Sequence, residues 1–189
     1  EQAMIDLLKK YDINAYASYV NSIGGNIRLE VGEQDSLTYI AAEKLFMRGD
    51  NDGARRSLIN YLQTFPEGAF SSNANFYLGS IAFAKKEFDE AIQRFKSVIA
   101  SGDTKFLEES VARTAEIEYL SKDYPAALES FKRLQIVAEN PENRQAARLG
   151  IMRCALQTGQ QKDALLAADE LLKEPKLSPE LEAEARYVR

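Results

Sequence analysis

The fold is decided by residues 75–95, which read NFYLGSIAFAKKEFDEAIQRF. Apolar and small side chains recur there at helical spacing on both sides of the short polar segment Lys85-Lys86-Glu87-Phe88. After this segment Ala91, Phe95 and Val98 follow one another at the spacing i, i+4, i+7, which places them on one face of a helix. The stretch therefore predicts two amphipathic helices that are joined by a short turn and form a hairpin.

The same mark, an alanine followed by larger or apolar residues four and seven positions later, occurs four times. The instances are Ala54/Leu58/Tyr61, Ala91/Phe95/Val98, Ala127/Phe131/Leu134 and Ala164/Ala168/Leu171, and successive alanines lie 36 or 37 residues apart. Twelve residues before each alanine, the first helix of the hairpin carries Ala42, Gly79, Ala115 or Met152. Small residues let two helices approach to about 8 Å, a rule that Met152 breaks. A constant period of this kind predicts an array of helical hairpins.

Short polar turns separate the predicted helices. Within the hairpins the turns are residues 48–51, 85–88, 121–124 and 158–161, and between hairpins they are residues 65–68, 101–104, 139–142 and 177–180. Asn140 and Ser178 each precede a proline and then a glutamate, a combination that favours the start of a helix. We therefore expect four repeats, at about residues 35–70, 71–103, 104–140 and 141–177, followed at 178–189 by the opening of a fifth first helix.

The first 34 residues fit this pattern less well. Residues 1–11 and 13–23 are interpreted as a degenerate, shortened helix pair, in which Ala15 and Tyr19 repeat part of the mark. Gly24 to Gly32 alternates apolar and polar residues, as a short extended segment does. We interpret this segment as an irregular connector over the edge of a hairpin, with a partner-binding flap as the alternative. The sequence is expected to be the interior of a longer array, truncated at both ends.

Composition argues against several classes of function. The chain of 189 residues is 45% hydrophobic, carries a net charge of -5 and has a pI of about 5.0. It has no basic field for nucleic acid, and no apolar run approaches the roughly 18 to 20 residues of a membrane span. With no histidine and one cysteine, it lacks the residues for a zinc site or a Ser/His/Asp triad. We therefore expect no nucleic-acid partner, membrane insertion, cofactor, metal or catalytic site.

Three local patterns are assigned to structure rather than to chemistry. Asp50-Asn51-Asp52-Gly53 resembles the start of a calcium loop, but Tyr61 stands where the twelfth-position glutamate is required, and the segment coincides with a hairpin turn. The adjacent carboxylates Glu108 and Glu109 are expected on solvated faces of a helix. Cys154 is interpreted as a small buried hydrophobic residue.

These repeats resemble the tetratricopeptide repeat, whose unit is commonly about 34 residues long. The second repeat carries the fullest match, with Leu78-Gly79 followed by Phe88-Asp89-Glu90-Ala91-Ile92 and Phe95. Pro66 and Pro141 supply the terminal mark in other repeats. The resemblance covers residues 36–189. It implies an all-α fold in which antiparallel helix hairpins stack as a right-handed α-solenoid, and it implies a role in binding another protein or peptide.

A narrower resemblance rests on the longer period and on residues 64–70 and 73–79. These features are similar to bacterial cell-envelope members of the family, of the Tol-Pal-associated and outer-membrane assembly lipoprotein types. The resemblance implies a periplasmic or outer-membrane-associated scaffold, with the cytoplasm as the alternative compartment.

In this family the first helices of the repeats line a concave groove. That implies four stripes here, Tyr39/Glu43/Phe46, Phe76/Ser80/Phe83, Ala112/Glu116/Tyr119 and Leu149/Arg153/Leu156. Mixed aromatic and polar side chains suit the capture of a peptide or helix. In the alternative interpretation, the last member of each stripe packs on the next repeat. The candidate contact residues are Tyr39, Glu43, Phe46, Phe76, Ser80, Phe83, Glu116, Tyr119 and Arg153.

Charged residues on this surface leave two interpretations open. Family members that grip C-terminal carboxylates use a lysine and an asparagine, whereas the first repeat here offers Tyr39 and Glu43, which argues against that mode of binding. Arg113 and Arg153 are candidate anion contacts, and the alternative is that each pairs with a neighbouring glutamate across the stack.

Three functional hypotheses follow. The leading one is an adaptor that binds a protein through the groove of first helices. The second is a spacer or self-assembly module that forms homodimers through its truncated ends, where Leu165, Leu172, Leu181 and Tyr187 lack a next repeat. The third is an enzyme whose catalytic domain lies outside these residues.

Overall fold

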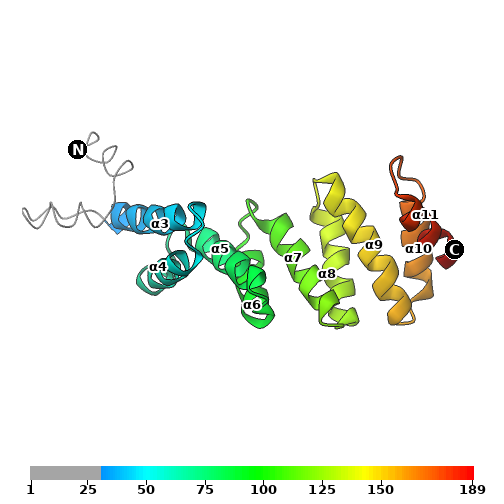
Figure 1. Ribbon diagram of the computed structural model, residues 1–189, viewed down its shortest axis with the longest axis horizontal. Coiled ribbons are helices and arrows are strands. Elements are labelled where there is room, and N and C mark those ends of the chain that lie inside the picture. The colour runs from blue at the N-terminus through cyan, green and yellow to red at the C-terminus, as the bar shows by residue number, and fades with distance from the viewer. Residues whose placement is uncertain (1–30) are drawn as a thin grey trace, which may run out of the picture. The chain divides into compact units, whose positions relative to one another are not determined.

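The computed structural model describes residues 31–189, and this part of the chain contains nine helices and no strand (Figure 1). The prediction of an all-α helical repeat is therefore confirmed. The chain divides between Lys86 and Glu87 into two compact units. This boundary lies in the turn inside the second predicted repeat, because α5 packs on α4 whereas α6 packs on α7.

The first unit contains α3 (Val31–Met47), α4 (Asn51–Thr64) and α5 (Ser71–Ala84). Helix α3 packs against α4, and α4 packs against α5. The predicted core mark of the first repeat, Ala54/Leu58/Tyr61, is fully buried, as is Ala42 on the facing helix. The alanine at each closest approach lets larger side chains from neighbouring turns interlock around it.

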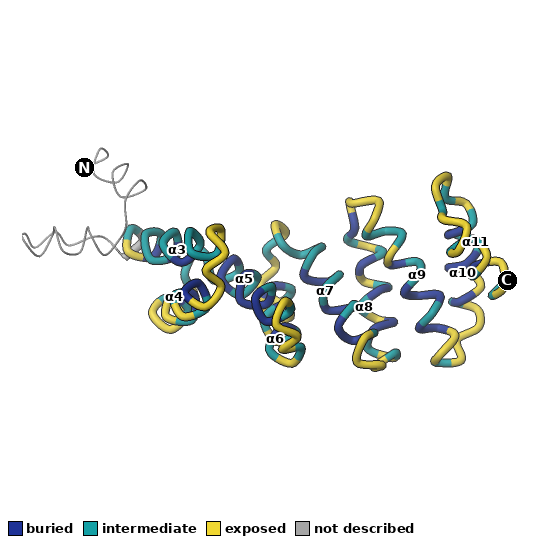
Figure 2. Tube along the Cα trace, in the orientation of Figure 1, coloured by how far each residue is buried: buried dark blue, intermediate teal, exposed yellow. Residues whose placement is uncertain are grey.

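The second unit contains α6 (Phe88–Ser101), α7 (Leu107–Leu120), α8 (Tyr124–Val137), α9 (Pro141–Gln157), α10 (Gln161–Leu171) and α11 (Pro179–Val188). Helices α7 to α10 pack each on the next in chain order. The marks Ala127/Phe131/Leu134 and Ala164/Ala168/Leu171 lie in one apolar core with Ala115 and Met152. Exposed residues gather at the turns between these helices (Figure 2).

The predicted turns within the hairpins are confirmed, and they share one backbone conformation. Gly49, Lys86, Lys122 and Gly159 stand at equivalent positions, and their φ angles are 82°, 61°, 62° and 73°. This left-handed conformation ends each first helix and turns the chain into the second. The side chains of Asn140 and Ser178 cap α9 and α11, as the sequence predicts. The connection predicted at residues 177–180 instead spans residues 172–178, because α10 already ends at Leu171.

The start of α3 differs from the sequence-based expectation. Val31 and Gly32 are helical, although their alternation with neighbouring residues predicted an extended segment. The apolar and polar alternation is too short there to outweigh the continuous helical pattern that follows it. The predicted helices at residues 1–11 and 13–23, and the rest of the predicted connector, lie outside the described residues.

No helix within residues 31–189 combines the length and the apolar character that a membrane span requires.

Candidate binding groove

In the first unit, the candidate residues Tyr39 and Glu43 belong to a hydrogen-bonded network. The Tyr39 hydroxyl donates to Glu43 Oε1 over 2.6 Å, and the Tyr77 hydroxyl donates to the same oxygen over 3.0 Å. Asn73 Nδ2 in turn donates to the Tyr39 hydroxyl over 3.1 Å. Tyr39 is only 2% exposed. Tyr39 therefore lies beneath this surface and stabilises it, and one carboxylate oxygen of Glu43 accepts hydrogen bonds from two tyrosines.

Burial fixes the protonation state of these tyrosines. Burial first, and then the hydrogen bond to Glu43, raises the pKa of both Tyr39 and Tyr77 above the ordinary tyrosine value. Both hydroxyls therefore stay protonated and act as donors throughout the physiological pH range.

Three polar contacts join α3 to α5 and its preceding loop at the same sequence separation. Asp35 Oδ2 accepts from the Ala69 backbone N–H over 2.8 Å, and the Tyr39–Asn73 and Glu43–Tyr77 contacts follow one helical turn after another. Each pair is 34 residues apart. Asp35 also accepts from the buried hydroxyl of Tyr61, whose pKa is raised to about 12 by burial and then by this carboxylate. These contacts fix the register between the two helices.

The remaining candidate residues of the first unit also have internal partners. The rings of Phe46 and Phe76 contact that of Tyr77, with centroid distances of 4.6 and 5.8 Å. The Ser80 hydroxyl donates to the Phe76 carbonyl over 2.9 Å. Phe46, Phe76, Ser80 and Phe83 nevertheless stay partly exposed, so packing and contact with a partner are compatible at these positions.

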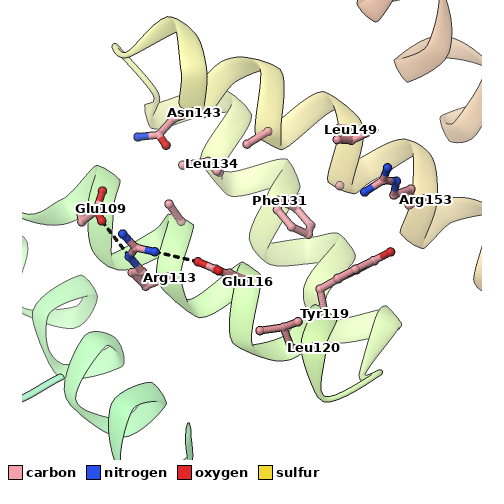
Figure 3. Close-up of a pocket in the computed structure, with 13 residues that line it drawn as sticks. Glu109, Arg113, Glu116, Tyr119, Leu120, Phe131, Leu134, Asn143, Leu149 and Arg153 are labelled. Atoms are coloured by element: carbon pink, nitrogen blue, oxygen red, sulfur yellow. Dashed lines mark hydrogen bonds and ion pairs between the residues drawn. The ribbon is translucent and has the colours of Figure 1, made fainter. Parts of the chain in front are cut away.

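In the second unit, a hollow lies between two consecutive first helices, α7 and α9 (Figure 3). Its volume is about 290 Å³. We call it the α7–α9 groove. Two of the predicted stripes meet in it, because its lining includes Ala112, Glu116, Tyr119, Leu149 and Arg153. The other lining residues are Glu109, Arg113, Leu120, Phe131, Leu134, Asn143, Ala146 and Gly150.

The floor of the α7–α9 groove is apolar and comes partly from the second helix between its walls. Phe131 and Leu134 of α8 were predicted as core residues, and they also line the hollow. Gly150 of α9 lies against the Phe131 ring, so that a Cβ added at position 150 would stand 2.4 Å from ring carbons. The spacing of the alanine marks does not predict this role of Gly150, because the role depends on the close approach of a ring from another helix.

The α7 wall carries one arginine between two glutamates. Arg113 Nε donates to Glu109 Oε1, and Arg113 Nη1 donates to Glu116 Oε2, each over 2.9 Å (Figure 3). All three side chains are 39% to 46% exposed. Both of these glutamates lie on the same helix as Arg113, one turn before and one turn after it, so Arg113 forms ion pairs within α7.

The α9 wall carries Arg153, whose charge is already paired. Arg153 Nε and Nη2 donate to the two carboxylate oxygens of Glu184 in α11, each over 2.7 Å. The hydrogen bond from Arg153 lowers the pKa of Glu184, and the same bond raises the pKa of Arg153. Tyr119 extends toward Arg153 in the groove (Figure 3). For Arg153, the predicted pairing with a glutamate across the stack is confirmed.

A second depression, of about 310 Å³, lies along the second helices α8 and α10. Polar side chains bridge it: Lys132 Nζ lies 2.7 Å from Asp163 Oδ2, and Gln135 Nε2 donates to Glu170 Oε2 over 2.8 Å. Its polar groups therefore satisfy one another. The α7–α9 groove has more apolar surface within reach of a ligand, because its floor is formed by Phe131 and Leu134.

Other residues singled out in the sequence have structural roles. Asp50 caps α4 by accepting from the Gly53 backbone N–H over 2.9 Å, and Asp52 pairs with Lys85. Glu108 does not simply face solvent, because it accepts hydrogen bonds from the backbone of the α8–α9 loop. Cys154 is fully buried, as predicted, and burial raises the pKa of its thiol to about 11.

Comparison with known proteins agrees with this architecture. Residues 41–104 match the family model of the tetratricopeptide repeat. No curated protein sequence matches the chain significantly. Among solved structures, the MamA protein superposes with a TM-score of 0.59 at 18% identity, over 75% of this chain and 73% of that chain. YrrB, a tetratricopeptide repeat protein with an unusual peptide-binding site, superposes with a TM-score of 0.62 at 13% identity, over 93% and 92%.

At such identities these likenesses show the fold alone. Proteins with tetratricopeptide repeats generally mediate protein–protein interactions, and their repeats are scaffolds rather than catalytic domains. Residues 41–104 are thus similar to tetratricopeptide repeats, and the described part of the chain has the all-α helical repeat fold of these solved structures.

Proposed function

We propose that this chain is a non-catalytic scaffold that binds a protein or peptide in the α7–α9 groove. The observation that carries this proposal is the hollow between two consecutive first helices, with an apolar floor and partly exposed polar walls. Its volume of about 290 Å³ lies at the lower limit of the roughly 300 to 1,000 Å³ of small-molecule pockets. Such a hollow suits one or two side chains of a partner rather than a cofactor. The peptide-binding site of YrrB adds support by analogy.

The proposal is tested by filling the hollow from its edge. Ala146 lines the groove and is exposed, so Ala146→Phe places a ring in the hollow without disturbing the core. The matched control is Ala100→Phe, at an exposed position of α6 outside the groove lining. Immobilised wild-type chain and both variants are incubated with extract of the source cells, and bound proteins are identified by mass spectrometry. We expect the specific partner to bind wild type and Ala100→Phe but not Ala146→Phe. A partner that binds all three equally uses another surface.

Charge reversal at Glu116 gives a second test of the groove. Glu116→Lys is expected to weaken binding of the same partner, because it changes the net charge of the α7 wall from negative to positive. Glu43 is less suitable for this purpose, since its carboxylate also holds Tyr39 and Tyr77. If a Glu43 variant no longer binds the partner, the result does not show whether the variant lost a contact with the partner or lost stability.

We propose further that the scaffold acts in the bacterial cell envelope, in the periplasm or at the outer membrane. The support is the resemblance of residues 64–70 and 73–79, and of the repeat period, to envelope members of the family. Fractionation of cells that produce the tagged full-length protein tests this location. Recovery with cytoplasmic markers contradicts it and favours the alternative compartment.

A spacer or self-assembly module is the second candidate function. The observation that favours it is a group of exposed apolar residues on α10 and α11, in which Leu166 is 65% and Tyr187 is 93% exposed. Light scattering of wild type and of the double variant Leu166→Ser/Tyr187→Ser distinguishes the two states. A dimer in wild type and a monomer in the variant supports self-assembly, and a monomer in both contradicts it.

A further inference from the structure

The α7–α9 groove has an acidic character that narrows the chemistry of its occupant. On the α7 wall, a single guanidinium serves the two carboxylates of Glu109 and Glu116, and each carboxylate uses one oxygen for it. Opposite, the charge of Arg153 is neutralised by Glu184 through two hydrogen bonds of 2.7 Å. The groove therefore has an excess of negative charge beside an apolar floor.

The charge of the rest of the molecule has the same sign. The whole chain carries a net charge of -5, and α7 itself contains four glutamates and one arginine. Because Glu109 and Glu116 are 42% and 46% exposed, a cation from outside reaches them without first entering the core. A positively charged segment is attracted to this wall at long range and forms charge-assisted hydrogen bonds on contact.

The length of the groove limits the size of the segment. Glu109 and Leu120 mark the two ends of its α7 wall, and eleven helical steps between them span about 16 Å. An extended peptide covers that distance with about five residues. Glu116 lies on the same wall as Ala112, one helical turn away along α7, so a cation bound to Glu116 stands close to a side chain seated over the apolar floor.

We propose that the α7–α9 groove binds a short protein segment that places one apolar side chain on Phe131 and Leu134 and a neighbouring lysine or arginine against Glu116 and Glu109. The incoming cation takes the carboxylate oxygens that Arg113 leaves open. This inference rests on the proposed function, because it names the chemistry of the ligand for the same groove.

The test uses the full chain and a positional-scanning array of capped pentapeptides as the probe. We expect the bound peptides to combine one leucine, phenylalanine or methionine with an adjacent lysine or arginine. The strongest such peptide is then resynthesised with a fluorescein label, and its Kd is measured by fluorescence anisotropy. Glu116→Gln is expected to weaken binding about fivefold, and the double variant Glu109→Gln/Glu116→Gln further. The matched control Glu129→Gln, at an exposed position of α8 outside the groove, leaves the Kd unchanged.

Three outcomes are distinguished by the variants. Basic and apolar peptides that lose affinity with Glu116→Gln and with Ala146→Phe support the inference. The second outcome is peptides that require an acidic residue, bind more tightly to Glu184→Gln and no longer bind Ala146→Phe. This outcome overturns the inference of a basic ligand but leaves the groove as the binding site, with Arg153 as the contact. Peptides whose binding is unaffected by Ala146→Phe, or an array without binders, overturn both the inference and the proposed function. Circular dichroism of each variant verifies that it is folded.

Discussion

At the scale of the residue, Glu43 shows how one side chain stabilises a helix interface from a partly exposed position. Its carboxylate oxygen accepts from Tyr39 on its own helix and from Tyr77 on α5. Both tyrosines are buried, and a buried hydroxyl without an acceptor costs free energy. The glutamate is therefore needed by the fold whether or not a partner also contacts it.

Replacement of Glu43 by alanine is expected to lower the free energy of unfolding by about 1 to 3 kcal/mol, because two hydroxyls lose their acceptor. Glu43→Gln keeps an acceptor oxygen in the same place and is expected to have a smaller effect. Urea denaturation followed by circular dichroism measures both. Equal stability of Glu43→Ala and wild type contradicts the structural role and leaves contact with a partner as the function of the residue.

The sequence predicts which single residues are buried, but it does not predict their contacts with other helices. The repeating alanine mark correctly predicted that Leu58, Phe95 and Leu134 are buried, because a single periodic helix face determines burial. The contacts between residues 34 positions apart were not predicted. They depend on how far one helix slides along the next, and the period of 36 to 37 residues does not specify that shift.

At the scale of the element, the hairpin turns place two lysines in a backbone conformation that favours glycine. Lys86 and Lys122 have φ angles of 61° and 62°, where the two equivalent positions are Gly49 and Gly159. A left-handed conformation costs a residue with a Cβ about 1 to 2 kcal/mol. The turns at Lys86 and Lys122 are therefore less stable locally than the same turns with glycine at these positions.

Lys122→Gly is expected to raise the free energy of unfolding by about 1 kcal/mol, since the relief of strain exceeds the added freedom of the unfolded chain. Lys122→Ala is the control, because it removes the charge and keeps the Cβ. Thermal and urea denaturation compare the three proteins. A similar gain in both variants attributes the effect to charge and contradicts the conformational explanation.

Glu108 links α7 to the start of α9. Its carboxylate accepts from the backbone N–H groups of Glu139 and Asn140 over 2.9 and 3.1 Å, and from Asn143 Nδ2 over 2.7 Å. Burial raises the pKa of Glu108, but the hydrogen bonds from Asn143 and from the loop lower it more, so that the pKa is below the ordinary glutamate value. The carboxylate form is thus favoured by the fold.

A lowered folded-state pKa gives a defined pH dependence. The contribution of Glu108 is fully present above the unfolded-state pKa, about 4.3, and is lost as the pH falls through the lower folded-state value. The difference in melting temperature between wild type and Glu108→Gln is therefore expected to be constant from pH 7 to 5 and to shrink below about pH 4. A difference that persists unchanged to pH 3 contradicts the role of the carboxylate.

The sequence predicts the turns and helix starts more completely than it predicts the lining of the α7–α9 groove. Turn positions and proline-preceded caps follow from local chemistry, so the starts of α9 and α11 were correctly predicted. The α7–α9 groove brings together two predicted stripes, but its floor was not predicted as a lining. The Phe131 ring is both core and floor because Gly150, on the next helix, has no side chain to cover it.

At the scale of the whole molecule, each of the two compact units contains an apolar core of described residues. One core comprises residues between Tyr39 and Ile81, and the other comprises residues between Val111 and Ala185. Because each core draws on residues of one unit, each unit has an internal source of hydrophobic stabilisation.

The second unit is expected to fold without the first. A protein of residues 87–189 should give a helical circular dichroism spectrum and a cooperative urea transition, since the helices that pack around its core all lie within it. Loss of the cooperative transition in this fragment contradicts that independence. In that case the stability of each unit depends on its neighbour, as it does in tightly coupled repeat arrays.

The single thiol of the chain gives access to the kinetics of the groove. Cys154 is fully buried in α9, the helix that also contributes Gly150 and Arg153 to the α7–α9 groove. Because the thiol is fully buried and burial raises its pKa to about 11, it reacts with an alkylating reagent only when this helix opens toward solvent. The labelling rate of the native protein therefore reports how often the α9 wall detaches, and a ligand that spans both walls is expected to slow that rate in proportion to its occupancy.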